Sequence, residues 1–186
     1  MNTKYELVPG DEKPIGGGRT VKRIRALVAI GLSVAAGDLG GYIESEANLS
    51  MSGNAWVSGN AWVYGNAQVS GNAWVSGNAR VSGNALVSGN ALVYGNALVY
   101  GNAWVYGDGL IFWASKVGSE NGTLTVYNTK DNELQVTRGC FIGSVDEFLT
   151  ASEAKHDDDT HLEYRLLIEV AHSRITRARK ALEGTK

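Results

Sequence analysis

A pattern of small and apolar residues repeats every six positions through the middle of the chain. From Gly53 onward the triplet Gly-Asn-Ala occurs nine times without an insertion, and a valine follows each triplet after one residue. The alanine and valine of each unit are two residues apart, so both point to the same side of a short strand. Glycine tolerates a positive φ without steric cost, and asparagine is the next most tolerant residue. The pattern therefore predicts short strands and tight corners that alternate and stack on themselves.

Two weaker units, which begin at Gly41 and Ala47, extend the repeat zone to residues 41–113. The spacing resembles that of the hexapeptide-repeat family, whose fold is a left-handed parallel β-helix built from triangular turns. The resemblance implies a mainly β chain with about four coils of about 18 residues each, closed by caps at both ends. The alanines and valines would form interior columns. Asn60, Asn78 and Asn96 would align at one corner as a ladder of amides.

The residue between the alanine and valine of each unit points away from the predicted core, as does Leu110 between Gly109 and Ile111 of the next unit. Eight of these ten residues are apolar. One of the three faces carries only apolar residues, while Arg80 and Gln68 interrupt the other two. Contiguous apolar surface of this extent is typical of an interface, and Trp and Tyr are enriched at binding hot spots. The alternative for at least one face is that the chain's own terminal segments cover it. The solenoid residues that we expect at an interface are Trp56, Trp74, Leu92 and Leu110 on the all-apolar face, with Trp62, Trp104, Tyr94, Tyr100 and Tyr106 beside it.

Residues 1–40 are expected to form a β-hairpin cap on the solenoid. Lys4–Val8 and Arg19–Ile30 have the composition of strands, and Pro9–Gly18 is expected to be the loop between them. The three glycines at 16–18 are not followed by the Lys-Ser or Lys-Thr of a phosphate-binding loop, so they predict a flexible hairpin tip. The role expected for this segment is to close the open end of the repeat array.

Residues 114–143 predict a β-hairpin, with strands at Thr123–Asn128 and Leu134–Phe141, and residues 144–186 predict a helical segment. Capping boxes at Ser144–Glu147 and Thr160–Glu163 predict two helix starts. The second helix carries one apolar stripe, which must be buried against the solenoid, the hairpin or a sister helix. The stripe consists of Tyr164, Leu167, Ile168, Ala171, Ile175, Ala178 and Leu182, of which Ile168 and Ile175 are also interface candidates.

Composition and charge narrow the classes of function. The net charge is −2, and residues 51–113 of the repeat zone hold only two charged residues, Arg80 and Asp108, so we expect no nucleic-acid partner. The basic end of the last helix and Asp157–Asp159 at its start are explained by the helix dipole. One cysteine fits a reducing cytosol, and the sequence has neither a signal peptide nor an apolar run long enough to span a membrane. We therefore expect a cytoplasmic protein with no membrane contact.

The catalytic groups typical of hexapeptide-repeat enzymes are missing from the repeat zone. The acyltransferases of that family use a histidine on the solenoid or on a loop that projects from it. In this sequence His156, His161 and His172 all lie in the predicted helices. Cys140 falls in a predicted strand and is expected to be a half-buried structural thiol. We expect no catalytic residue, no cofactor and no metal site. Two alternatives stay open. One is an acyltransferase, and the other is a sponge, a protein that sequesters a small nucleotide signal by holding it with Tyr and Arg at subunit junctions.

The segment GDLGGYIESEANLS before the repeats, and NGTLTVYNTK and VTRGCFIGSVDEF after them, are similar to segments of small accessory proteins of phages and prophages. The resemblance implies expression in the cytoplasm of a bacterial host. Combined with the apolar outward positions, it predicts a non-catalytic homo-oligomer, a dimer or a trimer. Such a protein would work by binding a host component, for example as an inhibitor of host defence.

Overall fold

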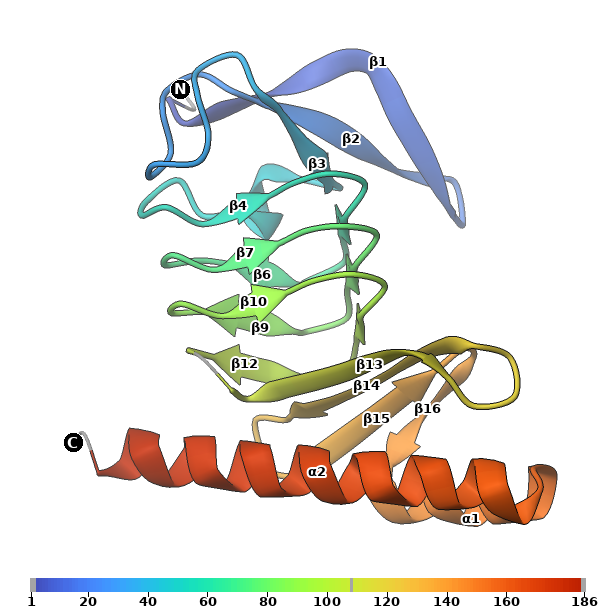
Figure 1. Cartoon of the computed structure of the whole chain (residues 1–186). Helices are drawn as coiled ribbons and strands as arrows, with labels where there is room; N and C mark the ends of the chain where they lie inside the picture. Colours follow the sequence, from blue (N-terminus) through green and yellow to red (C-terminus); the bar gives the residue numbers. More distant parts are fainter. Residues whose placement is uncertain (1–2, 108, 185–186) are drawn as a thin grey trace.

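A β-solenoid forms the middle of the molecule, with a hairpin at one end and a sheet covered by two helices at the other (Figure 1). The computed structural model describes residues 3–107 and 109–184. This arrangement confirms the mainly β solenoid of about four coils that the six-residue repeat predicts. Neither helix in the described part of the chain is long and apolar enough to cross a bilayer.

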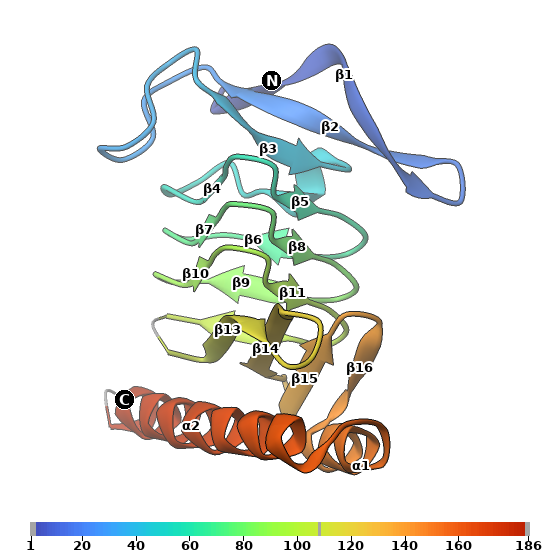
Figure 2. The ribbon, with the colours of Figure 1, turned by 45° about the vertical axis from the view of Figure 1, so that its right-hand side comes forward.

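Three stacks of very short parallel strands make the three sides of the solenoid (Figure 2). The strands are β4 (Trp56–Val57), β7 (Trp74–Val75) and β10 (Leu92–Val93) on side one; β5 (Trp62–Val63), β8 (Arg80–Val81) and β11 (Leu98–Val99) on side two; and β6 (Gln68–Val69), β9 (Leu86–Ser88) and β12 (Trp104–Tyr106) on side three. Each residue pairs with the one 18 positions later, as Trp56 does with Trp74. The predicted coil length is therefore confirmed.

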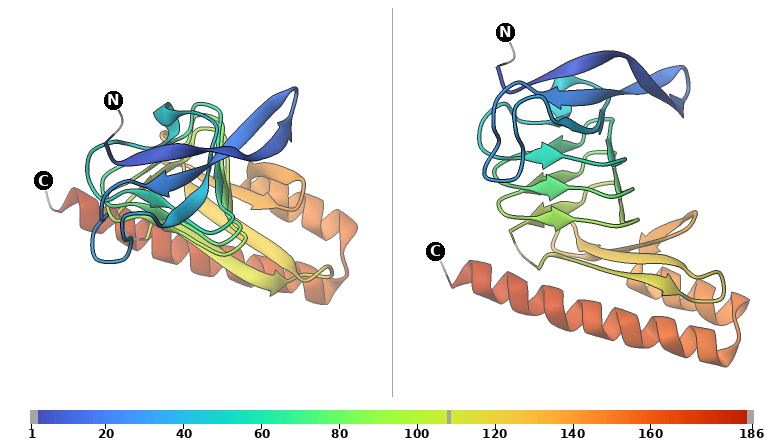
Figure 3. Two further views of the ribbon diagram at one scale, coloured as in Figure 1. Left: turned by 90° about the horizontal axis from the view of Figure 1, so that it is seen from above. Right: turned by 45° about the horizontal axis from the view of Figure 1, so that its top comes forward.

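Within the nine repeated units, the interior of the solenoid is built from alanine and valine. Every alanine and valine of the nine repeated units is fully buried, and the coils superpose when viewed along their axis (Figure 3). Amide ladders follow all three corners. At the corner predicted from the sequence, Nδ2 of Asn60 donates to Oδ1 of Asn78 at 3.5 Å, and Asn78 donates to Asn96 at 3.0 Å. That ladder is therefore confirmed.

The N-terminal cap is a long hairpin of β1 (Tyr5–Gly16) and β2 (Arg19–Ala26). Strand β2 pairs with β3 (Leu39–Ile43), and β3 pairs with β5 of the solenoid. The predicted loop at Pro9–Gly18 is wrong, because β1 continues through it with a bulge between Leu7 and Glu12. Strand β1 lies at the edge of its sheet, where a proline without an N–H is tolerated. The glycines at 16–18 all have positive φ and form the hairpin tip, as predicted.

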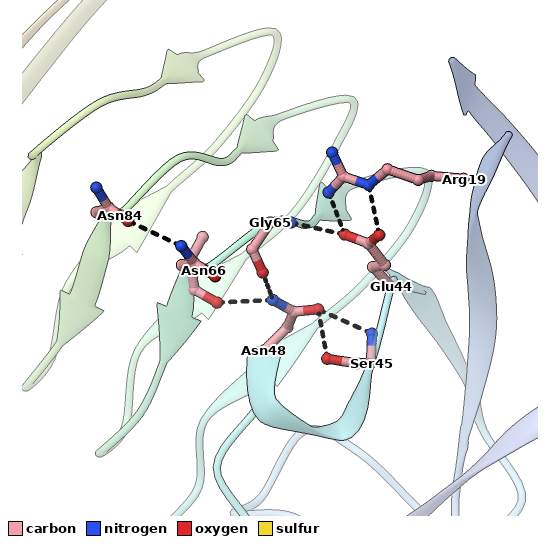
Figure 4. A network of polar contacts seen from close by, with 8 residues as sticks. Arg19, Glu44, Ser45, Asn48, Gly65, Asn66 and Asn84 are labelled. Carbon is pink, nitrogen blue, oxygen red and sulfur yellow. Dashed lines mark hydrogen bonds and ion pairs between the residues drawn. The ribbon is translucent and has the colours of Figure 1, made fainter. Parts of the chain in front are cut away.

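Side chains form hydrogen bonds with backbone N–H and C=O groups where the irregular first coil meets the regular ones (Figure 4). Asn48 is fully buried in the 3₁₀ turn Glu46–Asn48. Its Nδ2 donates to the carbonyl oxygens of Gly65 at 3.0 Å and Ala67 at 2.8 Å, while its Oδ1 accepts from the Ser45 N–H at 2.9 Å. Asn48 thus supplies the hydrogen bonds that a neighbouring coil supplies elsewhere.

A second polar link holds the hairpin on the first coil. The Arg19 guanidinium donates twice to Glu44, at 2.7 and 2.6 Å, and the Gly65 N–H donates to the same carboxylate at 2.8 Å. The ion pair with Arg19 and the backbone N–H hold the pKa of Glu44 below its usual value. The hairpin, the first coil and the second coil are therefore joined by one carboxylate.

The C-terminal segment is a four-stranded antiparallel sheet with two helices beneath it. The strands are β13 (Ile111–Val117), β14 (Gly122–Asn128), β15 (Leu134–Arg138) and β16 (Phe141–Ser144), followed by α1 (Val145–Lys155) and α2 (Asp158–Glu183). The predicted hairpin is the centre of this larger sheet. The capping box of Ser144 and Glu147 is confirmed at the start of α1.

Two local expectations for this segment are wrong. Helix α2 begins earlier than predicted, because the Asp157 carboxylate accepts from the Thr160 N–H at 2.8 Å and caps it, whereas Glu163 accepts from the Gly118 N–H at 2.6 Å. Cys140 is exposed in the turn between β15 and β16 and is not a half-buried strand residue. Gly139 before it adopts a φ of 59°, which breaks the predicted strand.

The apolar stripe of α2 packs on the sheet, one of the three partners left open by the sequence. Tyr164, Ile168, Ala171 and Ile175 are buried in a second core that includes Leu124, Val126 and Leu110. Helix α1 lies beside α2 under the sheet (Figure 2). Because Ile168 and Ile175 are buried within the chain, these two interface candidates do not lie on its surface.

Candidate functional site

The all-apolar face of the solenoid is covered at both ends by the chain's own terminal segments. Trp56 is buried under β3, so closely that a Cβ atom at Gly40 would lie 2.7 Å from Cζ2 of its ring. At the other end Leu110 is buried in the core that α2 closes. The expectation that these two residues line an interface is therefore wrong, because the caps use them as their own packing surface.

The middle of that face remains open, and we call Trp74, Leu92 and Tyr94 the open strip. Trp74 is half-buried, and its indole N–H donates to the Ser58 hydroxyl at 3.0 Å, which fixes the ring against the neighbouring corner. Leu92 pairs directly with Trp74 across β7 and β10 and is 56% exposed, and Tyr94 is 60% exposed. The open strip is thus an uncharged apolar surface on a rigid backbone.

The second side of the solenoid is partly occupied. The Arg80 guanidinium lies 4.5 Å from the centre of the Trp62 ring, a cation–π contact that covers this candidate. The Tyr127 hydroxyl accepts from the backbone N–H of Tyr100 at 3.1 Å, which ties the last coil to β14. Burial raises the pKa of the Tyr100 phenol to about 12. Trp62 and Tyr100 therefore contribute less to an open surface than the sequence predicts.

The third side ends in a cavity of about 540 Å³ between the last coil and the end of α2. The rings of Trp104 and Tyr106 form one wall, with centroids 6.1 Å apart and planes inclined by 21°. Arg179 forms another wall, and its Nε–H donates to Oδ1 of Asn128 at 2.6 Å. Burial lowers the pKa of Arg179. The volume is in the range of small-molecule sites.

Sequence reasoning identified the aromatic wall of this cavity but not the cavity itself. Trp104 and Tyr106 stand out as residues on the same outward side of one strand. Arg179 comes from α2, whose position relative to the solenoid no local pattern specifies. Only the tertiary structure brings the two walls together.

The histidines lie in or beside the C-terminal helices rather than on the solenoid. Nδ1 of His156 is 3.4 Å from the Ser119 hydroxyl, and Nδ1 of His161 is 3.3 Å from the Ser152 hydroxyl. His156 and Cys140 line one cavity of about 430 Å³, together with Arg138 and Tyr164. Among the described residues, no three His, Cys, Asp or Glu side chains are grouped closely enough to hold a metal ion.

The repeat itself matches a known family model. The model described as the YdcK β-solenoid repeat matches residues 67–81, 79–94 and 91–107. This chain is a β-solenoid repeat protein. The three matches begin 12 residues apart, which is two hexads, and they cover the middle and last coils of the solenoid. They do not extend to the caps, the sheet or the helices. No curated protein matches the chain.

Proposed function

We propose that this β-solenoid is a non-catalytic, oligomeric scaffold that acts by binding a protein of a bacterial host cell. In this proposal it is a phage or prophage accessory protein of the host cytoplasm, and one role of this kind is inhibition of a host defence system. The observation that carries the proposal is the open strip. An apolar surface held on a rigid solenoid is suited to a protein partner with a complementary apolar patch.

The chemistry of the solenoid faces supports binding rather than catalysis. The described outward positions carry tryptophan, leucine, glutamine and a single arginine, and that arginine is engaged with Trp62. General acid–base catalysis needs a titratable group within hydrogen-bond reach of the reacting atoms. Apart from the Tyr94 phenol, the open strip offers no such group, so its main contribution is contact area.

Replacement of Leu92 by aspartate tests the open strip. Because Leu92 is more than half exposed, we expect a change in stability of about 0.5 kcal/mol or less. A charge at the centre of the strip should abolish binding of the partner. The measurement is affinity capture from bacterial lysate with wild type, Leu92→Asp and the control Gln68→Glu, which alters an exposed outward position on another side. A partner that binds equally to wild type and to both variants would contradict the proposal.

Acetyl-CoA provides a separate test of the non-catalytic part. We expect isothermal titration calorimetry to give no saturable heat with this ligand, because the solenoid lacks a histidine base beside a loop that could hold the pantetheine arm. Saturable binding together with slow hydrolysis of the thioester would support the acyltransferase alternative instead.

A further inference from the structure

Helix α2 carries a second apolar stripe on the side that faces away from the sheet. Leu162, Leu166 and Val170 follow each other at intervals of four residues, and their side chains are 40%, 51% and 48% exposed. At about 100° per residue, this stripe lies opposite the buried stripe of Tyr164, Ile168 and Ile175. The outer surface of α2 lies at the end of the molecule, beyond the sheet (Figure 1).

Charge is distributed unevenly along the same surface of α2. Its first turn carries Asp158 and Asp159, and its last turns carry Arg177 and Lys180; all four are exposed. Asp159 and Arg177 are 18 residues apart, about five helical turns, so both lie in line with the stripe. In the described part of the chain, neither side chain has an ion-pair partner. The stripe thus has an acidic end and a basic end.

We propose that a second copy of this chain covers the stripe, with the two α2 helices antiparallel about a two-fold axis. In this arrangement Leu166 packs on Val170 of the partner subunit, and Asp159 faces Arg177 of the partner subunit. Two-fold symmetry makes each contact occur twice. A parallel pair would place like charges opposite each other, so charge selects the antiparallel orientation.

This inference rests on the oligomeric part of the proposed function and assigns it a surface. Pairing through α2 joins the molecules at their C-terminal ends. The open strip lies on a side of the solenoid, so it stays free in both copies. One dimer would therefore present two open strips to partners, which raises the effective concentration at a bivalent target.

Sedimentation velocity on the full chain over a concentration series tests the interface. We expect wild type to be a dimer, and Leu166→Glu to raise the dissociation constant by about tenfold or more, because it places a charge in both halves of the apolar contact. The matched control is Leu32→Glu, which changes a fully exposed leucine in the N-terminal segment. This control should leave the dimer unchanged.

Charge reversal tests the orientation. Asp159→Arg and Arg177→Asp should each weaken the dimer, because each places like charges opposite each other twice, and added salt should reduce both effects. The double variant carrying both substitutions restores opposite charges across the interface and should recover the dimer. Circular dichroism of all variants verifies that α2 remains helical.

Two outcomes would overturn the inference, and each is distinguishable from failure of the proposed function. If wild type stays monomeric at every concentration, both the α2 interface and the oligomeric part of the proposal are wrong, while capture by the open strip is judged separately. If a dimer persists in Leu166→Glu and both charge reversals but dissociates in Leu92→Asp, the copies meet through the open strip. In that case only the assignment to α2 is wrong.

Discussion

Replacement of Gly77 by alanine is expected to destabilise the solenoid by about 3 kcal/mol or more. Gly77 occupies a corner with a φ of 72°, which by itself costs an alanine about 1–2 kcal/mol. A Cβ atom there would also lie 2.8 Å from the carbonyl oxygen and 3.0 Å from the nitrogen of Gly95 in the next coil. Both atoms are backbone, so the two coils would have to separate. Unfolding in urea, followed by circular dichroism, measures the effect.

Gly95→Ala is the matched control. Gly95 has the same φ of 72°, but a Cβ atom there would meet only Nε1 of Trp113, at 3.8 Å, which is ordinary contact. This variant should therefore show only the conformational cost of about 1–2 kcal/mol. The difference between the two variants isolates the crowding between stacked corners. Equal destabilisation by both would mean that the stacking distance places no demand on the residue.

The corners explain why the repeat uses glycine at one fixed place. Neighbouring coils are held about 4.8 Å apart by their backbone hydrogen bonds. At Gly77 and Gly83 the glycine backbone of the next coil occupies the space that a side chain would need. Glycine is thus required both by φ and by the closeness of the coils. Local backbone preference and long-range stacking favour the same residue, which is why the sequence repeat predicts the solenoid so well.

Outside the repeat, local sequence patterns predict fewer of the element boundaries and side-chain contacts. The Ser144 capping box was found because all its partners lie within four residues. The continuation of β1 past Pro9 depends on pairing with β2, and the engagement of Glu163 depends on Gly118, 45 residues away. The turn at Cys140 exists because β16 folds back on β15. These features depend on tertiary contacts, so the periodicity of the sequence does not predict them.

The same distinction applies to the candidate surface. Trp56, Trp74, Leu92 and Leu110 occupy equivalent outward positions, and the repeat predicts their direction correctly. It does not predict which of them the caps cover, because the caps lie outside the repeat. On α2 the buried stripe follows the i, i+3, i+4 spacing over about five turns, while the opposite stripe at Leu162, Leu166 and Val170 is marked only by a four-residue spacing within a charged helix.

Asn48→Asp is expected to cost about 2–4 kcal/mol at neutral pH, although the two side chains have nearly the same shape. The Asn48 side chain is fully buried and donates to the carbonyl oxygens of Gly65 and Ala67. A carboxylate cannot donate, so both carbonyls would lose their partner and face a negative charge. Asn66→Asp is the control, because Asn66 is exposed and donates to Asn84 in the amide ladder. That change should cost about 1 kcal/mol or less.

The pH dependence of Asn48→Asp separates lost hydrogen bonds from lost packing. Burial and the two carbonyl oxygens disfavour the charged form, so the pKa of the introduced carboxyl in the folded state lies above its unfolded value of about 4. The folded state therefore binds the proton more tightly, and the stability deficit relative to wild type shrinks as the pH falls through the folded-state pKa. Below that pKa, the neutral acid can donate one hydrogen bond.

Urea unfolding of wild type and Asn48→Asp at neutral pH and at about pH 5 measures the change, since wild type corrects for the titration of all other groups. A deficit that is the same at both pH values would show that packing, and not the amide's donors, is what the first coil requires of Asn48.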